Sequence, residues 1–422
     1  MPETTALIDR LRSRLPRDGF DDRDPRDVTG ALAAMVELAE GRRPGETRAA
    51  VFTPTIAENG WTSRRTIVQI CTGDVPFLVD SVAAAIAEAG PTVHLLLHPV
   101  VTVRRDDQGR LLEVGGLGGR SESWMHLETD RIPTVEQRDA LRERILSVVA
   151  DVHAAVADWS LLRRTCLDIV TRLRTSPPPT AAPAEISRGT EFLSWLADDH
   201  FTFLGYRAYA LESIDGEDVL RPIDDTGLGI LRDAPSRVVH LRPEARETAR
   251  EPRILTITKA NSRSTVHRPV YLDYIGVRSF DDTGNVTGEH RFLGLFTSIT
   301  YASSVTTLPI ASAKVSAVLA ASGHAPGSHS AKELEQILED YPRDELFQDS
   351  PEHLLDVATR ISRLRERRGS AIFVRSDEFG RFVSALVLLP RDRYNTPVRL
   401  RIEALLKDAY GVDALEIGRA HV

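Results

Sequence analysis

The chain has 422 residues and a mass of 46.7 kDa, enough for two or three domains that each bury a core. Apolar residues make up 42% and charged residues 27%, which is typical of soluble folded proteins, and the formal charge of −8 disfavours nucleic acid or an anionic membrane as a partner. The beginning of the chain lacks the features of a signal peptide, and no apolar run is judged long enough to span a bilayer. With Cys71 and Cys166 as the only cysteines, we expect a cytoplasmic protein without a disulfide framework.

Residues 1–60 are rich in charge, Pro and Gly, and we interpret them as a helical or extended amino-terminal segment. Residues 61–175 follow the order strand, helix, strand, strand, helix, which resembles an ACT-like module of the ferredoxin type. Such a module has an antiparallel sheet with packed helices, but no fourth strand is evident after the second helix. The predicted elements are strands at 67–71, 93–104, 111–114 and 124–128 and helices at 78–86 and 135–173.

The Pro-rich segment 176–190 is predicted to be a linker. Strand patterns dominate residues 191–310, which we interpret as a mostly β middle domain, and helical patterns dominate a connector at 311–369. The fold class is therefore α+β.

Residues 370–416 contain a predicted hairpin and one helix, which is the start of a second ACT-like module. A single hairpin with one helix buries too little surface to be stable alone, so we interpret this module as truncated. The tail at 417–422 matches a translated frame of a common sequencing adapter, and we interpret it as adapter read-through.

Catalytic motifs are not found. The glycines at 115–119 and at 227 and 229 lack the spacing of a dinucleotide-binding turn, and no P-loop, nucleophile elbow or zinc-type Cys and His spacing is present. His94, His98 and His126 could suggest a metal, but histidines next to an apolar strand are more often packed or hydrogen-bonded. No catalytic, cofactor-binding or metal-binding residue is predicted.

Two segments remain as candidate effector or interface sites. The first is the turn formed by Asp74, Val75 and Pro76, where Asp74 is predicted to cap the following helix. The free N–H groups at the start of that helix could hold the carboxylate of an effector. Phe77 follows where a ligand-binding module usually has Gly, which favours a structural or interface role. The second is a polar loop between two strand-like segments, which could hold an anion, dock another domain or be a solvated hairpin end. Its candidate residues are Lys259, Asn261, Arg263, His267 and Arg268.

Long segments in one order carry a family resemblance. They include PFLVDSV from Pro76, HLLLHPVVTVRRD from His94, WLADDHFTFLGYR from Trp195, TKANSRSTVHRPVYLDYIGV from Thr258 and FGRFVSALVLLPRDRYN from Phe379. Together they resemble the amino-terminal portion of the large bacterial NAD-specific glutamate dehydrogenases.

The resemblance implies a parent enzyme that converts L-glutamate, NAD⁺ and water to 2-oxoglutarate, ammonia and NADH in amino-acid catabolism. Its catalytic and NAD-binding residues would belong to a carboxyl-terminal domain outside this chain, so NAD is expected for the parent and not for this segment. The expected partners are that catalytic domain, further copies in a homo-oligomer and an amino-acid effector. The alternatives left open are a free-standing ACT-type amino-acid sensor and an oligomerisation scaffold.

Overall fold

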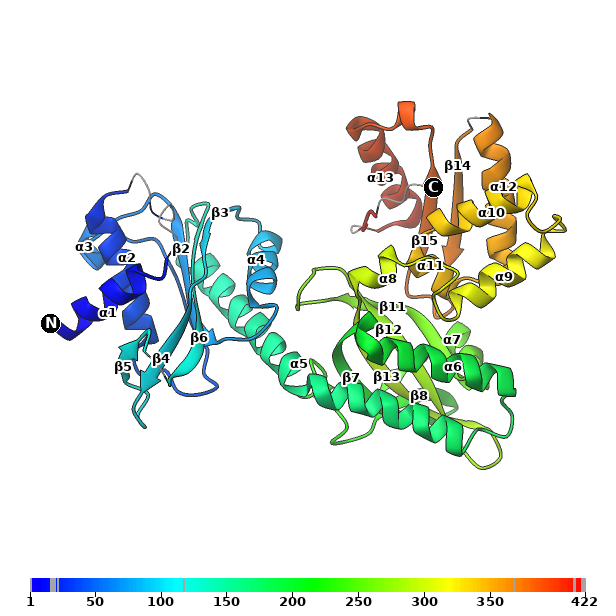
Figure 1. The fold of residues 1–422 in the computed structure, drawn as a ribbon, viewed down its shortest axis with the longest axis horizontal. Coiled ribbons are helices and arrows are strands. Elements are labelled where there is room, and N and C mark those ends of the chain that lie inside the picture. Colours follow the sequence, from blue (N-terminus) through cyan, green and yellow to red (C-terminus); the bar gives the residue numbers. More distant parts are fainter. Residues whose placement is uncertain are drawn as a thin grey trace. The chain divides into compact units, whose positions relative to one another are not determined.

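The structure is a computed structural model that describes residues 2–15, 20, 23–116, 118–367, 369–412 and 415–418 (Figure 1). These residues form two compact units. The first comprises residues 1–159, 228–232 and 263–271, and the second comprises 160–227, 233–262 and 272–422. The division falls after Trp159, whereas the predicted linker 176–190 lies within the second unit. Helix α6 begins at Pro183 in that segment, because proline suits the first turn of a helix.

The sheet of the first unit is antiparallel, and its strand order is β1-β2-β6-β4-β5, with β3 also paired to β6. In a ferredoxin-type module the place next to the first strand belongs to the fourth strand. Here β1 fills that place next to β2, with Ala50 opposite Gln69. The predicted boundary at residue 61 separated β1 from the sheet because its five residues are all half-buried and show no alternation. The strands are β1 Arg48–Phe52, β2 Thr66–Gly73, β3 Val93–Leu97, β4 Val100–Arg105, β5 Leu111–Val114 and β6 Arg120–Thr129.

Helices contribute to both faces of this sheet. On one face, Cys71 and Trp124 belong to a buried cluster with residues of α1 and α2. On the other face, Thr72 Oγ1 lies 2.8 Å from His153 Nε2 of α5. The helices of this unit are α1 Pro2–Arg12, α2 Pro25–Ala39, α3 Ile56–Asn59, α4 Leu78–Glu88 and the first part of α5 Val135–Thr175.

Helix α5 corrects one expectation. Its 41 residues include a stretch long and apolar enough to cross a membrane, so the judgement that no such run exists is wrong for this helix. The same helix buries Ile145, Val149 and Val152 completely and carries Asp151 and Asp158. Because an apolar helix in the core of a folded protein passes the same test of length and composition, this finding is weak support for a membrane span.

The sheet of the second unit has the strand order β10-β8-β7-β13-β12-β11. An aromatic cluster packs at this sheet: the Trp195 ring of α6 lies 6.3 Å from Phe296 of β13, and Phe296 stacks on Phe347 at 4.9 Å. Such aromatic contacts add to the stability gained from burial. The strands are β7 Phe201–Ile214, β8 Glu217–Pro222, β10 Val239–His240, β11 Leu255–Arg263, β12 Tyr271–Phe280 and β13 Val286–Phe296. The two residues of β9, Leu228–Gly229, belong to the first unit.

Helices α9 to α12 follow in the chain, in the region interpreted above as a helical connector. They share one core with the last hairpin, since Ile337, Val357 and Phe373 belong to a single buried cluster. The helices of the second unit are α6 Pro183–Trp195, a π-helical turn Leu196–His200, α7 Pro243–Arg250, α8 Ser298–Ala302, α9 Ala311–Ala321, α10 His329–Asp340, α11 Arg343–Gln348, α12 Pro351–Arg367, a 3-10 turn Arg391–Arg393 and α13 Thr396–Tyr410.

The last hairpin pairs β14 Ala371–Ser376 with β15 Val383–Leu388. One of its faces carries Phe373 into the core, but Ile372 and Val374 on the opposite face are 46% and 41% exposed. Helix α13 buries none of its residues. This hairpin and helix therefore leave much apolar surface uncovered. Most of the predicted read-through segment lies outside the described residues, at 419–422.

Candidate functional site

The turn after β2 extends further along the chain than predicted, to Phe77. Asp74 is exposed, and its backbone N–H donates to the Ser121 carbonyl at 3.3 Å. The helix begins at Leu78, so the prediction that Asp74 caps it with Pro76 in its first turn is wrong. The residue at the cap position is Phe77, which offers no side-chain oxygen to the first N–H groups. Val75 is half-buried and Pro76 is exposed.

Phe77 has the left-handed backbone of a glycine, with φ 71° and ψ −4°. An L-residue with a side chain is strained in this region because its Cβ approaches the carbonyl oxygen. Phe77 lies where a ligand-binding module usually has Gly, and its backbone has a conformation that Gly adopts readily. Strained residues of this kind persist where their surroundings hold them.

The residues around Phe77 are held by residues 263–271, which run from the last residue of β11 to the first residue of β12. We call this segment the strap. The strap belongs to the first compact unit. The His267 backbone N–H donates to Ser81 Oγ at 2.9 Å, and Ser81 Oγ donates to the Phe77 carbonyl at 2.7 Å. His267 Nδ1 lies 3.2 Å from Asp80 Oδ2, and the His267 ring lies 5.0 Å from the Phe77 ring. The two candidate segments thus meet at the first turn of α4, through His267.

Lys259 lies apart from the strap, in the second unit. Its Nζ is 2.6 Å from Asp273 Oδ1 and 3.0 Å from Asp344 Oδ2, and Tyr301 donates to Asp344 at 3.1 Å. Burial raises the pKa of the Asp273 carboxyl to about 6, against the attraction of Lys259 and with Asp344 adding to the rise. Burial would lower the pKa of Lys259, but the two carboxylates outweigh burial and raise it.

The two pKa shifts in this cluster favour opposite protonation states of the pair. Raising the Lys259 pKa favours a charged pair, whereas raising the Asp273 pKa favours a neutral acid. The Asp273 shift follows mainly from burial, with the Asp344 charge adding to it, and the Lys259 shift follows from its two carboxylate neighbours. The cluster has surplus negative charge, because the single Lys259 ammonium group can neutralise only one of the two carboxylates. The cluster is therefore a poor site for an anion.

The other loop residues are also engaged or exposed. Arg263 Nε donates to the Pro269 carbonyl at 2.9 Å, and the same guanidinium lies 3.9 Å from Glu88. Asn261 is exposed at the end of β11, and Arg268 is half-buried in the strap. The basic residues of the loop are spread over different environments and do not converge on one anion position.

Sequence reasoning missed a buried carboxylate, Glu122 of β6. Arg42 and Arg105 donate to it at 2.6 and 2.8 Å, and Trp124 Nε1 donates at 2.9 Å. Burial alone would raise the pKa of Glu122, but hydrogen bonds from Arg105, Arg42 and Trp124 lower it to about 2. The signal was present in the strand ESWMHLE, where Glu122 shares the inward face with Trp124. Ser81 was missed for a similar reason, as a buried polar residue on the apolar face of α4.

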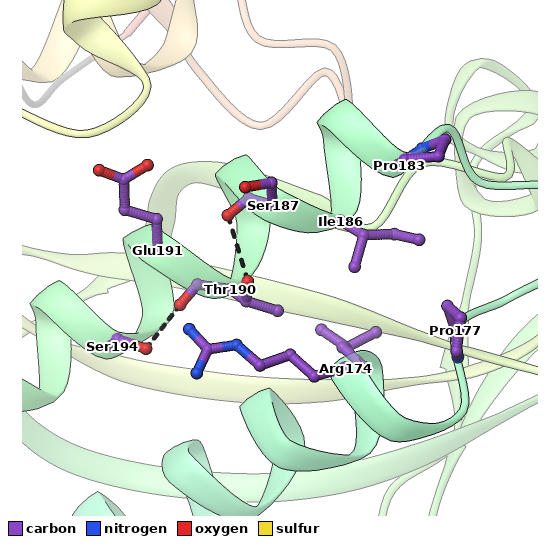
Figure 2. A pocket seen from close by; sticks show the side chains of 9 residues that line it. Arg174, Pro177, Pro183, Ile186, Ser187, Thr190, Glu191 and Ser194 are labelled. Atoms are coloured by element: carbon purple, nitrogen blue, oxygen red, sulfur yellow. Dashed lines mark hydrogen bonds between the residues drawn. The ribbon is translucent and has the colours of Figure 1, made fainter.

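The pocket drawn in Figure 2 lies in the second unit, between the end of α5 and helix α6, with a volume of about 640 Å³. Arg174 extends across it, whereas the Glu191 carboxylate points away from the guanidinium. Ser194 Oγ donates to the Thr190 carbonyl at 2.7 Å. Both charged side chains are exposed, and a convergent set of polar groups is not formed. The residues that line it are Leu173, Arg174, Pro177, Pro183, Ile186, Ser187, Thr190, Glu191 and Ser194.

The histidines considered for a metal have separate partners. His94 Nε2 lies 2.6 Å from Asp130, His98 pairs with Ser123, and His126 Nδ1 lies 3.1 Å from the Gln69 amide. Among the described residues, no three His, Cys, Asp or Glu side chains gather as metal ligands. The described glycines at 115–119 lie in the connection between β5 and β6, which both pair antiparallel with β4, and no helix follows this connection to face a pyrophosphate.

Comparison with known proteins agrees with a chain built from ACT-type modules. Three family models match in order: "Glutamate dehydrogenase, ACT1 domain" over residues 7–145, "Glutamate dehydrogenase, helical motif 1" over 308–367 and "Glutamate dehydrogenase, ACT2 domain" over 371–420. The chain belongs to the glutamate dehydrogenase family that carries these regions. The predicted family and the α+β fold with ACT-like modules are thereby confirmed.

The curated relatives are much longer than this chain. An NAD-specific glutamate dehydrogenase of Halomonas elongata is 35% identical over 414 residues, which are 96% of this chain and 26% of that protein. The protein of the same name from Pseudomonas aeruginosa is 35% identical over 417 residues, with 97% and 26% covered. The protein from Mycobacterium tuberculosis is 29% identical over 394 residues, with 91% and 23% covered. The chain therefore spans about a quarter of the length of the relatives it matches.

Proposed function

We propose that this chain is the regulatory and assembly region of an NAD-dependent glutamate dehydrogenase. The reaction of the whole protein would be the conversion of L-glutamate, NAD⁺ and water to 2-oxoglutarate, ammonia and NADH. The observation that carries the proposal is the similarity along nearly the whole chain to enzymes named for that activity, over a quarter of their length. Catalysis and NAD binding are assigned to the remaining part of such a protein.

The experiment compares two proteins from one source. The first is this 422-residue chain, and the second is the chain extended through the region that its relatives contain and it does not. We expect NADH formation from glutamate and NAD⁺ by the extended protein and none by the chain alone, followed by absorbance of NADH. NADH formation by the chain alone would overturn the division of roles.

Assembly is the role that the second unit supports best. The outer face of β14 and the whole of α13 leave apolar side chains in solvent, including Leu400 and Leu405 at 50% and 55% exposure. Such a surface is typical of one that another domain or subunit covers. We therefore propose contact with the catalytic part and homo-oligomerisation, which sedimentation of the extended protein would test. A cytoplasmic location remains part of this proposal and rests on the composition, in which Cys71 and Cys166 are the only cysteines.

A free-standing amino-acid sensor is the second candidate. It is favoured by the ACT1 match and by the turn after β2. Calorimetry of the chain with glutamate, 2-oxoglutarate and other amino acids separates the two roles. Binding by the chain alone supports the sensor, whereas self-association without any ligand supports a scaffold.

A further inference from the structure

The strap contacts two helices of the first unit, α4 and α5. Val266 at its tip is completely buried, although a solvated hairpin end would leave this side chain in water. Thr265 Oγ1 donates to Asp151 of α5 at 2.7 Å. Arg263 lies 3.9 Å from Glu88 in the last turn of α4, and His267 contacts the first turn of the same helix.

The strap also has its own internal structure. Ser264 donates its backbone N–H to the Val270 carbonyl at 2.8 Å and its Oγ to the Val266 carbonyl at 2.7 Å. These bonds shape the tip so that Val266 and His267 project from a closed loop. A preformed loop loses less conformational entropy when it docks than a flexible one would.

Two strained residues touch where the strap meets α4. Phe77 has φ 71° and His267 has φ 68°, and neither is a glycine. Their rings are 5.0 Å apart, and Ser81 Oγ connects their backbones by accepting from His267 and donating to Phe77. Strain on both sides of a contact indicates that the contact holds each backbone in place, and that each would relax on release.

We propose that the strap is an intramolecular closure of the first turn of α4. It occupies the space over Phe77, Asp80 and Ser81 and excludes small carboxylate ligands from that turn until it is displaced. This device lies within the first unit and does not depend on which reaction the longer relatives catalyse, so it can fail while the proposed function stands.

Hydrogen exchange of the whole 422-residue chain tests the closure. Val266→Asp places a charge in a fully buried site and should release the strap. We expect exchange to rise by at least about tenfold both in the strap and in the first turn of α4, with β14 and β15 unchanged. Val135→Asp is the matched control, because Val135 is 57% exposed at the start of α5, and it should leave both segments unchanged.

A second variant covers the case in which Val266→Asp unfolds the first unit. Ser81→Ala removes the acceptor of the His267 N–H and adds no bulk, so exchange should rise at both segments by a smaller factor. In either variant, a strap that exchanges faster while the first turn of α4 keeps its protection would overturn the proposal.

A ligand arm tests the exclusion directly. Each common L-amino acid is added to the wild-type chain at about 10 mM, enough to occupy a millimolar site. We expect no added protection at the first turn of α4 while the strap stays protected. Added protection there with the strap unchanged would mean that the turn is open to ligands, and the closure would be refuted.

Discussion

Replacing Glu122 by Gln tests how strongly the first unit depends on its buried carboxylate. The side chain is 1% exposed and accepts from Arg42, Arg105 and Trp124. Its pKa of about 2 against an ordinary 4.5 corresponds to about 3 kcal/mol of preference for the ionised form in the folded state. Gln keeps the shape but leaves two buried guanidinium groups without a counter-charge, which typically costs about 3–5 kcal/mol. We expect the free energy of unfolding to fall by about 3 kcal/mol at neutral pH.

The assay is urea unfolding followed by tryptophan fluorescence, with Trp124 next to the mutated site. Glu113→Gln is the matched control: Glu113 also faces two arginines, Arg10 and Arg104, but is 29% exposed, so its loss should cost less than about 1 kcal/mol. Because the folded pKa of Glu122 is lowered, its contribution is present above about pH 4.5 and is lost as the pH falls toward 2. A Glu122→Gln protein as stable as Glu113→Gln, or a difference that persists unchanged at pH 2, would refute the reasoning.

Three further changes have defined outcomes. Phe77→Gly and Phe77→Ala both remove the ring, but only Gly relieves the left-handed backbone, so the Gly variant should be more stable by about 1 kcal/mol in urea unfolding. Asp344→Asn removes the surplus charge next to Asp273, so the pKa of Asp273, followed by carboxyl NMR, should fall below about 6. The loss of folding stability as the pH rises from about 4 to about 6, followed by urea unfolding, should become smaller. Asp377→Ala removes the acceptor of Thr258 Oγ1 at 2.7 Å and should raise hydrogen exchange of the β14–β15 hairpin, at a cost of about 1–3 kcal/mol.

Each of these has its own contrary result. Equal stability of the two Phe77 variants would show that the backbone is not strained there. Asp356→Asn, which changes an exposed side chain, is the control for Asp344→Asn. If the pKa of Asp273 stayed near 6 in Asp344→Asn, the Asp344 charge would not contribute to raising it. Unchanged exchange in the hairpin of Asp377→Ala would mean that packing of Phe373 alone holds it.

The sequence allowed good prediction of long patterned elements. Strands such as Tyr271–Phe280 and the helix Val135–Thr175 carry enough apolar periodicity to be recognised without tertiary information. Strand β1 was not recognised, because a short half-buried strand has no pattern of its own until a partner is known. The predicted strand 93–104 is interrupted between Leu97 and Val100, where Pro99 has no N–H for the ladder.

The candidate site was predicted in part. The likeness to an ACT-like module singled out the turn, and polar side chains singled out the loop, but only the fold brings His267 onto α4 and places Lys259 beside two carboxylates. Those pairings join residues 186 and 14 positions apart, and Lys259 and Asp344 are 85 positions apart, so no local pattern could have given them. The left-handed backbone of Phe77 was not predicted either, although the sequence already showed a bulky residue where such a module usually has Gly.

The placement of β1 has a consequence for folding. Phe52 pairs with Ile67, so the outer position next to β2 is filled by a contact between neighbours in the chain. A strand returning after α5 would have to close a loop around all 41 residues of that helix. Contacts of short sequence separation form faster, and domains fold from the amino terminus as the ribosome releases them. The first sheet can therefore be complete once β6 has emerged, and α5 is free to continue past it without turning back.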